Sequence, residues 1–167
     1  NIKKIEKQIK FKKSQKQKFI EYSKLGLNYL KDISKVIKIN QGGLLLIDYG
    51  YDDRKMKNTL QAISNHKFAN ILDNIGNVDI THNINFNLFK KIIKNIGALK
   101  IDFTTQREFL IKMGIKQRAE IISKNKNFLK KTDIYYRLKR LIDEKQMGNL
   151  FKVMLIKNQK NNFRQGF

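Results

Sequence analysis

Asp48 and Tyr49 follow directly on an unbroken apolar run, residues 44–47, which the chain enters through two glycines. A short continuous apolar run bounded by glycine is typical of a strand covered on both faces, as in a parallel sheet. Open α/β sheets bind ligands beyond the carboxyl ends of their strands, so Asp48, Tyr49 and Tyr51 are candidates for function. A carboxylate can hold a guanidinium through two hydrogen bonds, and a tyrosine ring can stack on that planar cation.

Each of these residues also has a structural interpretation. Asp48 could equally cap the turn after the strand. Tyrosine rings beside a buried strand pack in the core or at its rim more often than they bind ligands. Gly50 is expected to serve the turn.

A second group of polar residues precedes a predicted helix over residues 85–96. Asp79 and Thr81 are expected to face the same crevice as Asp48, whereas Asn85 is predicted to be the N-cap of that helix. His82 is a possible general base, although the sequence shows no partner for it. The candidate catalytic residues are therefore Asp48, Tyr49 and Asp79, and the candidate substrate-binding residues are Tyr51, Thr81, His82 and Gln106.

The elements that must position these residues follow from hydrophobic periodicity. A helix is predicted to pass through residues 27–37 and to stop at Asn40, before the strand. Residues 51–76 are predicted to be an insertion with one short helix near residues 59–64. Further strands are expected at residues 98–104 and 150–156, and further helices at residues 106–113, 115–124 and 133–145, before a polar tail over residues 158–167.

The composition limits the classes of function. The chain has 167 residues, of which 41% are hydrophobic, and this indicates one domain with a core. The net charge of +22 comes mostly from lysines spread along the chain rather than gathered in one patch, and this spread argues against a nucleic-acid partner. There is no cysteine and there are two histidines, so no metal site is predicted, and a reducing, cytoplasmic location is expected. No apolar run approaches the length of a membrane span.

Residues 1–20 are predicted to be a basic helix or linker, separate from a domain over residues 21–167. Ile2, Ile5 and Ile9 share one helical face among lysines and glutamines. A solvated surface helix and a phosphate- or lipid-binding arm both remain open. The first residue is Asn1 rather than methionine, and we expect that upstream sequence is absent.

Several separated motifs, in this order, resemble the MidA family of S-adenosylmethionine-dependent methyltransferases. They are Gly42-Gly43-Leu-Leu-Leu-Ile-Asp48-Tyr49-Gly50, Asp79-Ile80-Thr81 with Phe86, Gln106 with Phe109-Leu110 and Gly114-Ile115, Met147-Gly148 with Phe151-Lys152-Val153, and Gly166-Phe167. The resemblance covers about residues 21–167. It implies an α/β fold that forms the C-terminal half of a class I, Rossmann-like methyltransferase sheet with added helices. Residues 43–49 would be its fifth strand, residues 98–104 its sixth and residues 150–156 its antiparallel seventh.

The resemblance implies a function as well. Mitochondrial members of the family methylate an arginine of a respiratory complex I subunit and support assembly of that complex. The implied cofactor is S-adenosyl-L-methionine, and the implied partners are a protein substrate with a target arginine and the missing N-terminal half, in cis or in trans. None of the nine glycines forms a Gly-x-Gly loop, so no cofactor-binding residue is predicted and the chain alone is expected to be inactive.

The chain departs from the family where relatives commonly read Asp-Leu-Thr-Ala-His-Val-Asp-Phe. The corresponding His and second Asp are Asn83 and Asn85 here. Two other classes of function therefore remain open: a non-catalytic remnant of a decaying gene, and a basic nucleic-acid-binding module whose affinity would fall steeply with salt.

Overall fold

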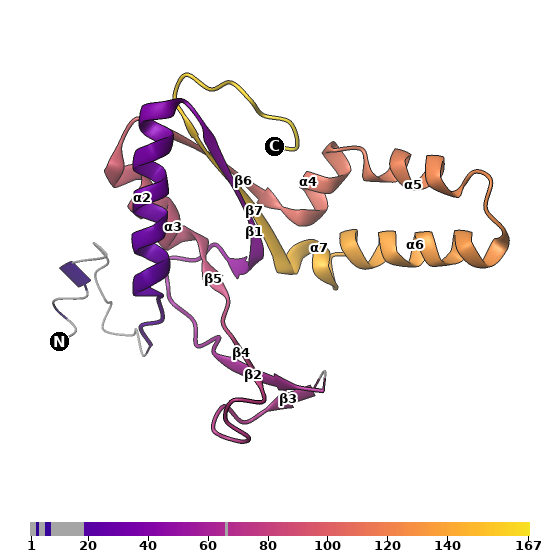
Figure 1. Cartoon of the computed structure of the whole chain (residues 1–167), viewed down its shortest axis with the longest axis horizontal. Coiled ribbons are helices and arrows are strands. Elements are labelled where there is room, and N and C mark those ends of the chain that lie inside the picture. The colour runs from indigo at the N-terminus through magenta and orange to yellow at the C-terminus, as the bar shows by residue number, and fades with distance from the viewer. Residues whose placement is uncertain (1–2, 4–5, 8–18, 66) are drawn as a thin grey trace.

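The computed structural model describes residues 3, 6–7, 19–65 and 67–167 (Figure 1). The basic helix or linker predicted for residues 1–20 lies mostly outside the described residues. The elements are α2 (Lys24–Asn40), β1 (Gly43–Tyr51), β2 (Gln61–Ser64), β3 (Lys67–Ala69), β4 (Asp79–Thr81), β5 (Ile84–Asn85), α3 (Phe86–Ile96), β6 (Leu99–Thr105), α4 (Gln106–Lys112), α5 (Ile115–Ser123), α6 (Phe128–Ile142), α7 (Met147–Leu150) and β7 (Phe151–Asn158).

The main sheet has the strand order β5-β1-β7-β6. β7 is antiparallel to both of its neighbours, β1 and β6, whereas β5 runs parallel to β1. The expected strands at residues 43–49, 98–104 and 150–156 are confirmed as β1, β6 and β7. The last strand in the chain lies between the other two, as the resemblance implied for an antiparallel seventh strand.

Helices α2 and α3 cover one face of this sheet (Figure 1). Each begins at a side-chain cap: the Gly26 N–H donates to Ser23 Oγ over 3.0 Å, and the Leu88 N–H donates to Asn85 Oδ1 over 3.1 Å. The predicted N-cap role of Asn85 is therefore confirmed. Residues from the two helices and from β7 form the core, in which Phe86, Ile93, Met154 and Ile156 are fully buried.

The opposite face of β1 is open, so the prediction of a strand covered on both faces is wrong. Leu45 and Ile47 keep 45% and 48% of their surface exposed, while Leu44 and Leu46 pack against the core. β1 pairs with β7 over seven residues, but on its other edge it meets β5 only at Gly50 and Tyr51. Within the described part of the chain, the apolar run therefore marks a strand with one open face and, over residues 43–49, a free edge.

The insertion after β1 forms a small antiparallel sheet, in the order β3-β2-β4, that projects from the main body (Figure 1). The expected helix near residues 59–64 is wrong, because β2 occupies residues 61–64. Four residues are too few to show a helical or strand period, and pairing of Ala62 with Ala69 and Ile80 decides the structure. Ala62 is buried within this small sheet.

Helices α5 and α6 form an arm that projects beyond α4 and α7 (Figure 1). The predicted bounds of α4 and α5 are confirmed to within one residue, whereas α7 was not predicted. The prediction for α6 is shifted: this helix begins five residues before the predicted Asp133, because Asn127 is its N-cap, and it ends at Ile142. The C-terminal segment is more than a polar tail: the Phe167 ring packs on Phe109 with 5.4 Å between centroids. Lys157, whose side chain is almost fully buried, forms an ion pair with Asp102 over 2.7 Å.

Gly50 lies inside β1 rather than in a turn, and it allows β5 and α3 to approach. A Cβ atom at this position would lie 2.3 Å from Ile84 O and 2.8 Å from the Phe86 ring. We predict that Gly50→Ala lowers the free energy of unfolding by about 1–3 kcal/mol, as overpacking does. Gly42→Ala is the control, because nothing lies within 4 Å of its Cβ. Equal thermal melting temperatures of the two variants would show that this close approach is unimportant.

The free edge and open face of β1 predict self-association of the 167-residue chain. Replacing Leu45 and Ile47 with threonine should reduce it, because both side chains lie on the open face. The control is Leu25→Gln with Ile39→Gln on α2, where the exposed fractions are 62% and 77%. Sedimentation velocity measures the outcome. A monomeric wild-type chain that melts sharply would contradict the prediction.

Candidate functional site

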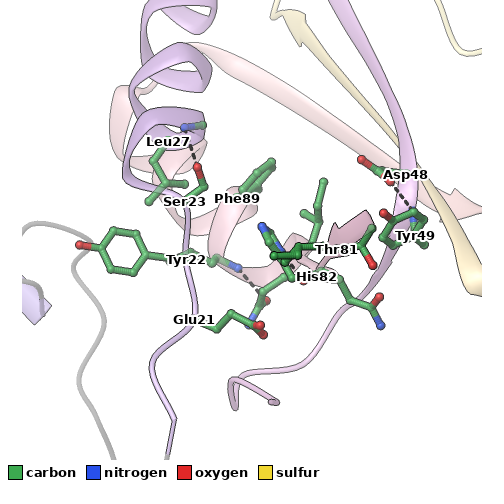
Figure 2. Close-up of a pocket in the computed structure, with 15 residues that line it drawn as sticks. Glu21, Tyr22, Ser23, Leu27, Asp48, Tyr49, Thr81, His82 and Phe89 are labelled. Atoms are coloured by element: carbon green, nitrogen blue, oxygen red, sulfur yellow. Dashed lines mark hydrogen bonds between the residues drawn. The ribbon is translucent and has the colours of Figure 1, made fainter. Parts of the chain in front are cut away.

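A cavity of about 340 Å³ lies where β1, the β4–β5 segment and the first turns of α2 and α3 meet (Figure 2). Its walls come from four separate parts of the chain, which the pairing of β1 with β5 brings together. The lining residues are Glu21, Tyr22, Ser23, Gly26, Leu27, Asp48, Tyr49, Ile80, Thr81, His82, Asn83, Ile84, Asn85, Leu88 and Phe89. Among these described lining residues, two are carboxylates, one is a histidine, and none is a lysine or an arginine.

Asp48 lies on the face of β1 that α2 and α3 cover, in line with Leu44 and Leu46. Its Oδ1 accepts a hydrogen bond from the Tyr49 N–H over 2.8 Å. Among the described residues, Oδ2 has no hydrogen-bond partner, so one oxygen stays available to a ligand. Asp48 therefore holds the backbone that follows it through Oδ1, as the capping interpretation predicted, and it offers Oδ2 to a ligand, as the site interpretation predicted.

Tyr49 lines the cavity, but its ring also packs edge-on against Phe151, with 5.6 Å between centroids. This contact fits the packing interpretation of Tyr49 better than stacking on a ligand. Thr81 lines the cavity too, and its Oγ1 accepts a hydrogen bond from Gln61 Nε2 over 3.2 Å. Four of the seven predicted site residues therefore line this cavity: Asp48, Tyr49, Thr81 and His82.

His82 lies among the lining residues with its ring partly buried. Its nearest polar contact is the carbonyl oxygen of Asn83, 3.4 Å from Nδ1. Among the described residues no carboxylate is hydrogen-bonded to this ring, so the carboxylate partner of a catalytic dyad is not found beside it. His82 stays a candidate for proton transfer.

The other three predicted residues lie elsewhere. Asp79 is exposed at the start of β4 and does not line the cavity. The Tyr51 hydroxyl accepts a hydrogen bond from the Lys57 N–H over 3.0 Å, and burial raises the pKa of this phenol. Gln106 is buried, and its Nε2 donates to Leu141 O over 2.9 Å, which ties α4 to α6. Tyr51 and Gln106 therefore hold segments of the chain together.

Glu21 is a cavity residue that the sequence did not indicate. Its Oε2 accepts hydrogen bonds from the Thr59 hydroxyl over 2.7 Å and from the Thr59 N–H over 3.2 Å. The same hydroxyl accepts a hydrogen bond from the Asn83 N–H over 2.9 Å. Thr59 thus joins the segment before α2 to the β4–β5 segment and fixes the second carboxylate. These contacts join residues 24 to 38 positions apart, which no local pattern reveals.

The described residues offer no evident metal site and no membrane span. Over residues 3, 6–7, 19–65 and 67–167, no three His, Asp or Glu side chains gather as metal ligands would. Within the same ranges, no helix is long and apolar enough to cross a bilayer.

Comparison with known proteins gives consistent matches. A family model described as "Putative S-adenosyl-L-methionine-dependent methyltransferase" matches residues 1–104. The chain is 26% identical over 117 residues to the mitochondrial protein arginine methyltransferase NDUFAF7 of Danio rerio, which covers 70% of this chain and 27% of that protein. It is 34% identical over 77 residues to the Caenorhabditis elegans homologue, which covers 46% of this chain and 18% of that protein.

Two solved structures from Burkholderia thailandensis share the fold. One is an uncharacterised protein with a TM-score of 0.77 and 20% identity, covering 87% of this chain and 40% of that one. The other was solved with S-adenosyl-homocysteine bound and has a TM-score of 0.66 and 23% identity, covering 83% of this chain and 38% of that one. The fold is therefore of the Rossmann-like class I type, and the chain spans well under half the length of these relatives.

Proposed function

The chain belongs to the MidA-like family of S-adenosyl-L-methionine-dependent methyltransferases, and we propose that it forms the acceptor side of such an enzyme, where an arginine of a protein substrate is methylated. One observation carries the proposal. In a chain with a net charge of +22, the described residues that line the cavity beside β1 include two carboxylates and no lysine or arginine.

The distribution of charge along the chain supports a cationic substrate at this cavity. Residues 21–83, which supply most of the lining, contain eight lysine or arginine residues and seven acidic residues. Residues 106–167 contain sixteen basic and five acidic residues. Because exposed charges act over about a Debye length of ~10 Å, a cationic peptide is repelled less by the nearly neutral residues 21–83 than by residues 106–167.

The two carboxylates are suited to hold a guanidinium. Asp48 is fixed by the Tyr49 N–H, and Glu21 is fixed by Thr59. Charged hydrogen bonds from a guanidinium to such fixed acceptors orient it and localise its charge on the nitrogens that do not react. This positioning contributes to the rate of transfer. The cofactor supplies the electrophilic methyl group, and His82 is the candidate acceptor of the proton that the guanidinium releases.

The cofactor is expected to be held by sequence beyond this chain. The described cavity residues are suited to bind the methyl acceptor. The sequence contains no Gly-x-Gly loop, whose backbone could approach the methionine and ribose groups of the cofactor closely. Relatives are several times longer than the part that this chain matches. The remaining half would come from the same protein or from a separate chain, and the 167 residues alone would not transfer methyl groups.

The location of the protein and its role in assembly of respiratory complex I are predictions. The name of the matched relatives places those proteins in mitochondria, which favours an organellar setting over the expected cytoplasmic one. A role in assembly of respiratory complex I follows only from the resemblance. The remnant hypothesis and the nucleic-acid hypothesis both predict that the cavity does not distinguish arginine from lysine.

Binding of a guanidinium tests the proposal without the cofactor. We predict that a short arginine peptide perturbs the NMR signals of the cavity residues and that a matched lysine peptide binds more weakly. Asp48→Asn should weaken arginine binding about tenfold or more, because charged hydrogen bonds contribute about 1.5–3 kcal/mol.

The control is Asp53→Asn, an exposed carboxylate outside the cavity that lies 3.8 Å from Lys57. Its removal also lowers the negative charge by one, so it corrects for long-range electrostatics. Equal affinity of the two variants, or equal affinity for arginine and lysine peptides, would overturn the proposal.

A further inference from the structure

The arm formed by α5 and α6 ends in a tip, residues 124–131, that lies far from α2 and β5 (Figure 1). The tip reads Lys124-Asn125-Lys126-Asn127-Phe128-Leu129-Lys130-Lys131. We propose that this tip docks on an anionic lipid bilayer, with Phe128 and Leu129 inserted and the lysines at the headgroups. The proposal is independent of the cavity and of the reaction proposed there.

The two apolar side chains at the tip are nearly fully exposed. Phe128 keeps 80% of its surface accessible and Leu129 keeps 76%. They occupy the first turn of α6, which Asn127 fixes by accepting a hydrogen bond from the Lys130 N–H over 3.0 Å. Two adjacent large apolar side chains on a rigid end of the protein lose contact with water only when something apolar covers them.

Four lysines surround this pair: Lys124, Lys126, Lys130 and Lys131. No acidic residue occurs between positions 121 and 132 of the sequence. Within the part of the chain that the structure describes, none of the four lies within ion-pair distance of a carboxylate. Their charges are therefore available to an external anionic surface, and lysine stems can extend toward headgroups while the apolar pair lies deeper.

The same chemistry continues along α6. Phe128 shares a shallow groove with Thr132, Tyr135, Tyr136 and Lys139. No residue of α6 is buried. Tyrosines favour the boundary between acyl chains and water, because the ring is apolar and the hydroxyl is polar. A basic helix with this exposed face is typical of an element that lies on a membrane surface.

Single-stranded nucleic acid is the other anionic partner that aromatic and basic side chains can bind. It requires bases to stack on aromatic rings. At the tip, Leu129 is one of the two most exposed apolar side chains, and it has no aromatic ring on which a base could stack. It lies beside Phe128, and the four lysines surround both residues. This arrangement favours insertion into an apolar phase over stacking.

Vesicle flotation with the full 167-residue chain tests the proposal, because aggregated protein does not float with lipid. We expect binding to vesicles of phosphatidylcholine with about 30% phosphatidylglycerol, weaker binding at high salt, and little binding to phosphatidylcholine alone. Phe128→Gln with Leu129→Gln should reduce partitioning at least about tenfold. Replacing the four tip lysines with glutamine should reduce it roughly fivefold for each lysine.

Control variants on α2 match both changes. Leu25→Gln with Ile39→Gln removes two exposed apolar side chains, and replacing Lys24, Lys31, Lys35 and Lys38 with glutamine removes four charges. Circular dichroism and thermal melting verify that each variant folds. The proposal is overturned if the tip variants and the α2 variants bind vesicles equally, or if single-stranded RNA binds the tip and anionic vesicles do not compete for it.

Discussion

The contact between β1 and its neighbours determines where the site can form. β7 pairs with β1 along seven residues, and on the other edge Gly50 brings Ile84 and the Phe86 ring against the strand. This close approach carries the β4–β5 segment to Asp48 and orients the first turn of α3 toward the same point. Without it, Asp48 would lie on a strand face open to solvent, and no cavity would unite it with Glu21.

The same geometry leaves β1 incomplete. Its edge over residues 43–49 has no partner among the described residues, and Leu45 and Ile47 face outward. An unpaired edge and an open apolar face on one strand are what we expect if, as proposed, further sequence completes the sheet. This expectation agrees with the finding that the chain matches only part of the length of its relatives.

Strands and helices with a long, clear period were predictable from the sequence, and α3, β6 and β7 are where the pattern placed them. The pattern could not show whether one or both faces of β1 are covered, because that depends on elements outside the run. Asp48 and Tyr49 were candidates because they follow the apolar run, Thr81 because it precedes the predicted helix, and His82 as a possible base; all four line the cavity. Glu21 was missed, because Thr59 brings it to the cavity through contacts between distant residues. Gln106 and Tyr51 do not line this cavity and join segments of the chain instead, and in sequence such a polar side chain looks the same as one that binds a ligand.

The central claim is that this chain is the acceptor half of a methyltransferase whose cofactor half is supplied by further sequence. Native mass spectrometry of the protein isolated from its source cells, with an antibody against residues 158–167 and with S-adenosyl-homocysteine present, tests it most directly. The account predicts a species of about twice the 19.8 kDa of this chain or more, the size of a complete domain of this class, with one cofactor bound. A 19.8 kDa species alone, without cofactor, would contradict it.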